Sequence, residues 1–141
     1  MRKRTQAREL ALQLMYQLDL RGDEILEEVN AALAPGAGDP EMVDFARELV
    51  HGCREKQPEI DRHIEEVAKN WQLKRMAAID RNILRLATYE LLYRDDIPPL
   101  VTINEAIDIA KKFSTKNSGP FVNGILDNIR LKAAPPGKQG T

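Results

Sequence analysis

This chain of 141 residues has very few of the side chains that carry covalent or metal chemistry. Its single cysteine, Cys53, excludes an intramolecular disulfide, and its two histidines, His51 and His63, lack the paired spacing of a structural zinc site. An isolated thiol of this kind is typical of a protein from a reducing compartment. We therefore expect no metal, no cofactor and a cytoplasmic location.

Sequence motifs for catalysis are missing as well. No glycine-rich phosphate loop of the form GxGxxG, or GxxxxGK followed by Ser or Thr, occurs anywhere in the chain. Cys53 falls on an apolar helical stripe, where a free cysteine is typical of a core and not of a nucleophile. The acidic pair Asp95-Asp96 precedes two prolines, which indicates a turn. These absences predict a protein that is not an enzyme.

Long apolar runs are also absent. No stretch approaches the roughly 18 apolar residues that a membrane-spanning helix needs, and no apolar segment follows the basic N-terminus as it does in a secretory signal. The hydrophobic fraction of 43% is nevertheless sufficient for the core of one domain. We therefore predict a single domain over residues 1–132 without membrane contact, followed by a flexible, Pro- and Gly-rich tail over 133–141.

Apolar residues recur at the spacing of an α-helix along most of the chain. About seven such segments, without a useful strand pattern, predict an all-α fold in the form of a compact bundle. A central helix over about 76–93 is apolar over a wide arc and is expected to contact several neighbours. Asp39-Pro40 is typical of a helix start. Thr102 and Glu105 form a capping box, which predicts a further helix from there to Phe113.

Positive charge is concentrated in three short stretches, although the net charge is only −1. Residues 1–8, 109–126 and 128–141 contain cations and no acid, so the rest of the chain is acidic. Basic segments on an acidic body predict a local site for a polyanion.

The first candidate site is the N-terminal arm, which carries Arg2, Lys3, Arg4 and Arg8. Arg4 and Arg8 are four residues apart and share a helical face if the helix begins near Lys3. Guanidinium groups on a rigid helix are suited to binding phosphates and to stacking on bases.

The second candidate site lies between Lys111 and Gly124. This segment combines three lysines, two phenylalanines and several amide and hydroxyl side chains. Proteins read single-stranded RNA with such groups, by aromatic stacking, positive charge and hydrogen bonds to base edges. Phe121 lies beside the apolar stripe of the last helix, so it either stacks a base from the rim or widens the core.

Three motifs, in this order along the chain, resemble the NusB family. They are Asp80-Arg81-Asn82-Ile83-Leu84-Arg85-Leu86-Ala87-Thr88-Tyr89-Glu90-Leu91, Ile103-Asn104-Glu105-Ala106-Ile107-Asp108-Ile109-Ala110-Lys111-Lys112-Phe113 and Phe121-Val122-Asn123-Gly124-Ile125-Leu126-Asp127. The first helix, from Arg4 to Tyr16, is similar to the opening helix of the same family.

This resemblance implies two three-helix bundles packed roughly perpendicular, and a factor of transcription antitermination that supports ribosomal RNA synthesis. It implies binding to boxA-type single-stranded RNA together with NusE, the small-subunit ribosomal protein ten, and contact with the RNA polymerase elongation complex through other Nus factors. The implied RNA-binding residues are Arg2, Lys3, Arg4, Arg8, Lys112, Lys116, Asn117, Phe121 and Asn123. An exposed side of the central helix, with Asp80, Arg81, Arg85 and Glu90, is the implied surface for the protein partner.

Two other functions are compatible with the same pattern. Similar bundles form the N-terminal module of ribosomal RNA cytosine methyltransferases, although the chain ends at Thr141 without the α/β domain that such an enzyme needs. A helical adaptor that never binds RNA is the other alternative, and it leaves the uneven charge without a role. A homodimer also stays open, because an apolar helix face can be buried within a monomer or between two copies.

Overall fold

The computed structural model describes residues 2–69 and 71–139 of the chain, and this part is almost entirely helical. The predicted all-α class is confirmed. The α-helices are α1 (Lys3–Arg21), α2 (Leu26–Ala32), α3 (Pro40–Glu55), α4 (Gln57–Val67), α5 (Ala78–Tyr93), α6 (Pro99–Phe113), α7 (Ser118–Ala133) and the one-turn α8 (Pro136–Gln139), with short 3-10 turns at Gly22–Ile25 and Leu73–Arg75. None of the described helices is both long and apolar enough to cross a bilayer.

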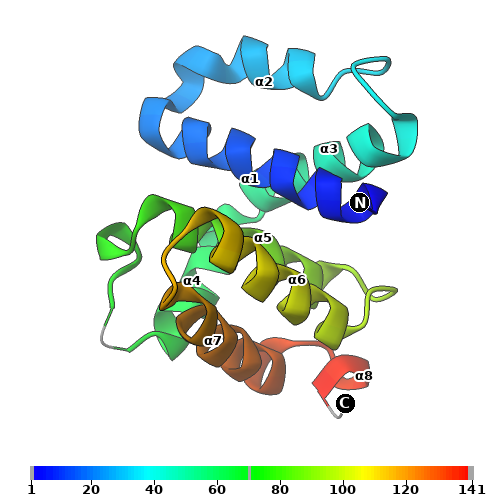
Figure 1. Cartoon of the computed structure of the whole chain (residues 1–141). Coiled ribbons are helices and arrows are strands. Elements are labelled where there is room, and N and C mark those ends of the chain that lie inside the picture. The colour runs from blue at the N-terminus through cyan, green and yellow to red at the C-terminus, as the bar shows by residue number, and fades with distance from the viewer. Residues whose placement is uncertain (1, 70, 140–141) are drawn as a thin grey trace.

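The helices form two groups that lie one above the other (Figure 1). Helices α1, α2 and α3 make the upper group in that view, and α4 to α8 make the lower one. Helix α5 lies between them and packs against α1, α3, α4, α6 and α7. This confirms its predicted place as the hub of the bundle. Gly52 on α3 permits one of these contacts, because a Cβ there would lie only 2.5 Å from the ring of Tyr89.

The start of α3 matches the sequence prediction. Asp39 is the N-cap, and its carboxylate accepts a hydrogen bond of 3.1 Å from the amide of Met42, while Pro40 takes the first helical position. This cap satisfies one of the amides that a helix start leaves unpaired.

The predicted capping box at Thr102 is wrong. Helix α6 begins three residues earlier, at Pro99, because a proline fits the first helical turn where no amide donor is needed. Thr102 is consequently an interior helical residue, and its hydroxyl donates a 2.8 Å hydrogen bond to Glu90. Glu105 accepts from Thr5 and Arg8 on α1 instead of capping its own helix.

The C-terminal tail also differs from the flexible segment that its composition predicts. Residues Pro136–Gln139 form a helical turn, and Ala134 and Lys138 are buried. The ammonium of Lys138 donates a 2.9 Å hydrogen bond to the carbonyl of Glu90, and burial lowers the pKa of this lysine. Residues 140 and 141 lie outside the described part. Residues 134–139 therefore cover the C-terminal end of α5.

Candidate nucleic-acid interface

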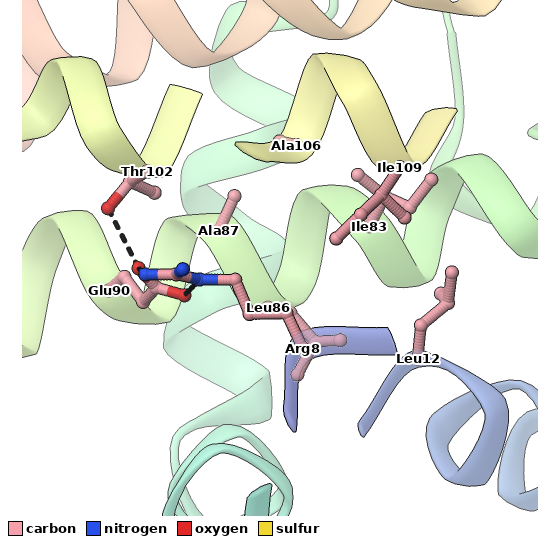
Figure 2. A pocket seen from close by; sticks show the side chains of 9 residues that line it. All are labelled: Arg8, Leu12, Ile83, Leu86, Ala87, Glu90, Thr102, Ala106 and Ile109. Atoms are coloured by element: carbon pink, nitrogen blue, oxygen red, sulfur yellow. Dashed lines mark hydrogen bonds and ion pairs between the residues drawn. The ribbon is translucent and has the colours of Figure 1, made fainter. Parts of the chain in front are cut away.

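Arg8 is a buried residue, although the sequence predicts an exposed cation that binds RNA. Only 6% of it is exposed, and its Nε and Nη2 atoms donate to the two carboxylate oxygens of Glu90 at 2.8 and 2.9 Å. A third donor, Nη1, lies 3.2 Å from Glu105. Figure 2 shows Arg8 reaching from α1 to Glu90, which also accepts the Thr102 hydroxyl. The expectation of an exposed Arg8 is thus corrected, because every part of its guanidinium is used inside the protein.

The remaining cations of the arm stay at the surface. Arg2, Lys3 and Arg4 are all exposed. Lys3 forms ion pairs with Asp39 and Glu41, at 3.2 and 3.5 Å. Within the described residues no carboxylate forms an ion pair with Arg2 or Arg4.

The guanidinium of Arg4 has a defined position nonetheless. It lies 4.6 Å from the centre of the Phe45 ring, and those of Arg8 and Arg94 lie 5.3 Å from the same centre. A cation over an aromatic face is attracted by the negative charge of the ring face. Arg8 and Arg94 are also paired with carboxylates, so Arg4 is the one of the three without an ion pair among the described residues, and Phe45 holds it against α3.

A polar groove of about 460 Å³ runs between α1 and α6. Arg2 lines one end of the groove and Lys112 the other. The lining also includes three acids, Glu9, Glu105 and Asp108, and the remaining lining residues are Thr5, Val101, Asn104 and Ile109. At 1.5 Å per helical residue, the stretch of α6 from Val101 to Lys112 is about 17 Å long. The groove therefore runs from the arm to Lys112, in the last turn of α6. The Lys112 ammonium is held 3.0 Å from Glu9, so its charge is partly neutralised.

The loop between α6 and α7 is held in place by Asp80 at the start of α5. The hydroxyl of Ser114 donates to Oδ1 of Asp80 at 2.7 Å, and that of Ser118 donates to Oδ2 at 3.1 Å. Ser118 also lies within hydrogen-bond distance of Ser114 and Thr115. This cluster leaves Lys116 and Asn117 exposed at the tip of an anchored loop, while Asn123 is exposed one turn into α7.

An aromatic hollow of about 240 Å³ lies beside this loop. Trp71 and Phe121 line it together with Arg75, Asp80 and Asn117, and its other lining residues are Met76, Ala77, Thr115 and Ser118. The rings of Trp71 and Phe121 meet edge to face, with centres 6.0 Å apart and planes at 77°. Phe121 is half-buried and packs against the core, so it widens the apolar face of α7 while its ring also lines the hollow.

Helix α5 does not offer the exposed partner surface that the resemblance implied. Glu90 is 2% exposed and Arg85 is 8% exposed. The guanidinium of Arg85 donates to both oxygens of Asp61, at 2.8 and 3.1 Å. This expectation is wrong for these two side chains because α5 is surrounded by five helices. Asp80 and Arg81 are half-buried near the N-terminal end of α5, where the helix approaches the surface.

A second polar cluster joins α1 to α5 at the other end of their contact. Asp19 accepts hydrogen bonds from Arg81, Asn82 and Arg85. Burial works to raise the pKa of Asp19, but the hydrogen bonds from Arg81 and Asn82 and the charges of Arg81 and Arg85 outweigh it, so the pKa is lowered. Together with Arg8 and Glu90, this cluster fastens the upper helices to the lower ones.

The structure thus separates the predicted RNA-binding residues into three groups, apart from Phe121, which is half-buried. Arg2, Arg4, Lys116, Asn117 and Asn123 are exposed; Lys3 and Lys112 are exposed but ion-paired; Arg8 is internal. Sequence reasoning missed Trp71, which is 54% exposed. The sequence feature that could have identified it is a large aromatic residue between two polar ones, Asn70 and Gln72, just beyond the apolar stripe of a helix.

Comparison with known proteins agrees with this architecture. The family model described as the NusB family matches residues 5–130. The transcription antitermination protein NusB of Desulforamulus reducens is 50% identical over 136 residues, which cover 94% of each chain, and that of Geotalea daltonii is 49% identical over 138 residues, covering 92% of this chain and 94% of the relative.

Solved structures agree as well. NusB of T. maritima superposes with a TM-score of 0.87 at 43% identity and covers 96% of this chain and 95% of its own. A chain from a structure of the antitermination factors NusB and NusE with double-stranded RNA has a TM-score of 0.77 at 32% identity, covering 92% of this chain and 96% of its own. The family match, the identity over nearly full length and the shared fold show that the chain belongs to the NusB family.

Proposed function

We propose that this protein is a transcription antitermination factor that binds boxA-type single-stranded RNA together with NusE and so supports transcription of ribosomal RNA. The observation that carries the proposal is the groove between α1 and α6, which has the basic arm at one end and the basic, aromatic loop near the other. An RNA strand crossing the groove would meet cations at both ends; of the three acids in the lining, Glu9 and Glu105 are already paired with Lys112 and Arg8. A related chain occurs in a complex of NusB and NusE with double-stranded RNA, which supports RNA binding together with NusE.

The proposed RNA contacts follow from exposure and pairing. Arg2, Arg4 and Lys116 are exposed cations without a carboxylate partner among the described residues, so they can bind phosphates at no cost in broken ion pairs. Asn117 and Phe121 face the aromatic hollow and are suited to base contacts. Lys3 and Lys112 make secondary contacts, because each must first leave its carboxylate. Asn123, exposed on α7, is a further secondary contact.

The proposed partner surface is the N-terminal end of α5, with Asp80 and Arg81. Arg85 supports it from inside by its ion pairs with Asp61 and Asp19, whereas Glu90 is buried near the other end of α5 and belongs to neither surface. Contact with the RNA polymerase elongation complex passes through other Nus factors in this proposal. The protein then acts by binding alone, without catalysis, in the cytoplasm where ribosomal RNA is transcribed.

Fluorescence anisotropy of a labelled boxA-type RNA tests the proposal directly. The RNA is titrated with this protein alone and with NusE, at two salt concentrations, beside a scrambled RNA of equal length. We expect binding that weakens with salt, tightens with NusE and is lost on the scrambled sequence. Equal binding of both RNAs under every condition would overturn the proposal and favour a helical adaptor.

A further inference from the structure

The hollow between Trp71 and Phe121 lies next to the proposed RNA-binding loop, and its lining is unusual for a protein surface. A tryptophan that is 54% exposed stands beside a second aromatic ring, and Met76 and Ala77 also line the hollow. Its volume of about 240 Å³ is below the roughly 300–1,000 Å³ of pockets for drug-sized ligands. A hollow of this size, lined by two aromatic rings, is suited to one nucleobase.

We propose that this hollow holds a single unpaired base of the bound RNA, and that Trp71 is the ring on which the base stacks. This inference rests on the proposed function and specifies the chemistry of its aromatic end. Base stacking on aromatic side chains is the common way in which proteins hold single-stranded RNA.

The angle between the two rings decides which of them stacks. Because their planes stand at 77°, a flat base parallel to one ring is nearly perpendicular to the other. Trp71 has the larger and more exposed ring, whereas Phe121 is half-buried and packs against the core. The base therefore stacks on Trp71 and meets Phe121 through an edge, while Phe121 holds the indole in place.

The polar groups around the hollow favour RNA over an apolar protein segment. Arg75 lines the hollow, and Lys116 belongs to the same exposed loop as Asn117; no carboxylate pairs with either cation in residues 2–69 or 71–139. The Asn117 amide carries both a donor and an acceptor, which is what reading a base edge requires. The one acid in the lining, Asp80, is occupied by the hydroxyls of Ser114 and Ser118 and so repels a phosphate less.

Trp71 is the only tryptophan of the chain, so its fluorescence reports on this hollow alone. The full-length protein is titrated with unlabelled boxA-type RNA, with and without NusE, and the signal of a Trp71→Phe chain measured in parallel is subtracted. We expect the RNA to quench the emission of Trp71. The same RNA with one abasic nucleotide, moved stepwise along the sequence, should lose this quenching at one position only.

Binding measured by anisotropy supplies the second readout. Trp71→Ala should weaken binding of the intact RNA by roughly 5- to 150-fold, the range for loss of one stacked aromatic ring, and Trp71→Phe should weaken it less. Trp71→Ala should have no further effect on the RNA that is abasic at the identified position. Leu131→Ala, which removes an equally exposed apolar side chain from the far end of α7, is the matched control and should leave affinity unchanged.

The possible outcomes separate this inference from the proposed function. RNA that binds by anisotropy without quenching Trp71, and with equal affinity for the Trp71→Ala chain, overturns the base pocket and leaves the proposed function intact. Quenching by NusE alone, with no change when RNA is added, assigns the hollow to the protein partner and overturns the inference. Absence of any specific RNA binding overturns both.

Discussion

Arg8 is one of the few buried charged residues among those that the structure describes. Its guanidinium is enclosed by the carboxylates of Glu90 and Glu105, and together they join α1 to α5 and α6. A buried ion pair adds little net stability compared with an apolar pair, but the removal of one partner leaves an uncompensated charge in the interior. The role of Arg8 is thus to position the arm that carries Arg2 and Arg4.

Replacement of Arg8 by alanine should therefore lower the free energy of unfolding by about 3–5 kcal/mol. Chemical denaturation measures this change. Arg2→Ala, which removes an exposed cation from the same helix end, is the control and should stay within about 0.5 kcal/mol of the parent. An Arg8→Ala chain that is as stable as Arg2→Ala yet binds RNA poorly would restore Arg8 as a direct RNA contact.

Cys53 should be inert to thiol reagents in the folded protein. It is fully buried, and burial raises the pKa of its thiol to about 12, so almost no thiolate exists near neutral pH. We expect labelling at pH 8 to proceed only as fast as the protein opens, and to become rapid in denaturant. Labelling of the native protein at the rate of a free thiol would show that α3 is not packed as described.

Sequence reasoning placed the apolar residues correctly but missed the burial of Arg8, Arg85 and Glu90. Helical periodicity placed Cys53 in the core correctly, because an apolar stripe has only one favourable direction. The burial of Arg8 depends on two carboxylates that are 82 and 97 residues away along the chain. No local pattern contains that information.

At the scale of the element, α6 shows how one motif can belong to two different interactions. Thr102 and Glu105 have the spacing of a capping box, but Pro99 starts the helix one turn earlier and turns both side chains into tertiary contacts. The local sequence correctly predicted a helix that ends at Phe113. It did not show whether the helix begins at Pro99 or at the capping-box spacing of Thr102 and Glu105.

The variant Glu105→Gln distinguishes these two roles of Glu105. Glutamine serves a capping box as well as glutamate does, so a capping role predicts almost no effect. In the structure the charge of Glu105 faces Arg8 at 3.2 Å, and its loss should cost roughly 1–3 kcal/mol of stability. Thermal denaturation of the two chains at neutral pH measures the difference. An unchanged melting temperature would contradict the interhelical role.

At the scale of the whole molecule, the two groups of helices are joined by polar clusters at both ends of the contact between α1 and α5. Arg8 and Glu90 form one cluster, and Asp19 with Arg81, Asn82 and Arg85 forms the other. Periodicity predicted the helices but not their arrangement, which came from the family resemblance. Neither periodicity nor the resemblance predicted the hollow beside Trp71. Its lining comes from residues 71–77, from the start of α5 and from residues 115–121, which are brought together only by the fold.

The Asp19 cluster should make the free energy of unfolding depend on pH. The folded state lowers the pKa of Asp19, so its stabilisation is complete above the unfolded value of about 3.9 and is lost as the pH falls through the folded value. An Asp19→Asn chain should be less stable than the parent at pH 7, and the gap should close on acidification. Denaturation curves at pH 7, 4 and about 2.5 provide the comparison. A gap that stays constant with pH would exclude the ionised carboxylate as its source.

The central claim is that one RNA strand contacts both the arm and the loop. Its most direct test is the salt dependence of affinity for boxA-type RNA, measured in the presence of NusE for the parent, Arg2→Ala, Lys116→Ala and the double variant. Each lost phosphate contact on a single strand lowers the slope of log affinity against log salt by about 0.7 in magnitude. We predict that decrease for each single variant, twice that for the double variant, and none for Lys132→Ala, an exposed lysine at the far end of α7. An unchanged slope for either Arg2→Ala or Lys116→Ala would contradict a strand that spans both sites.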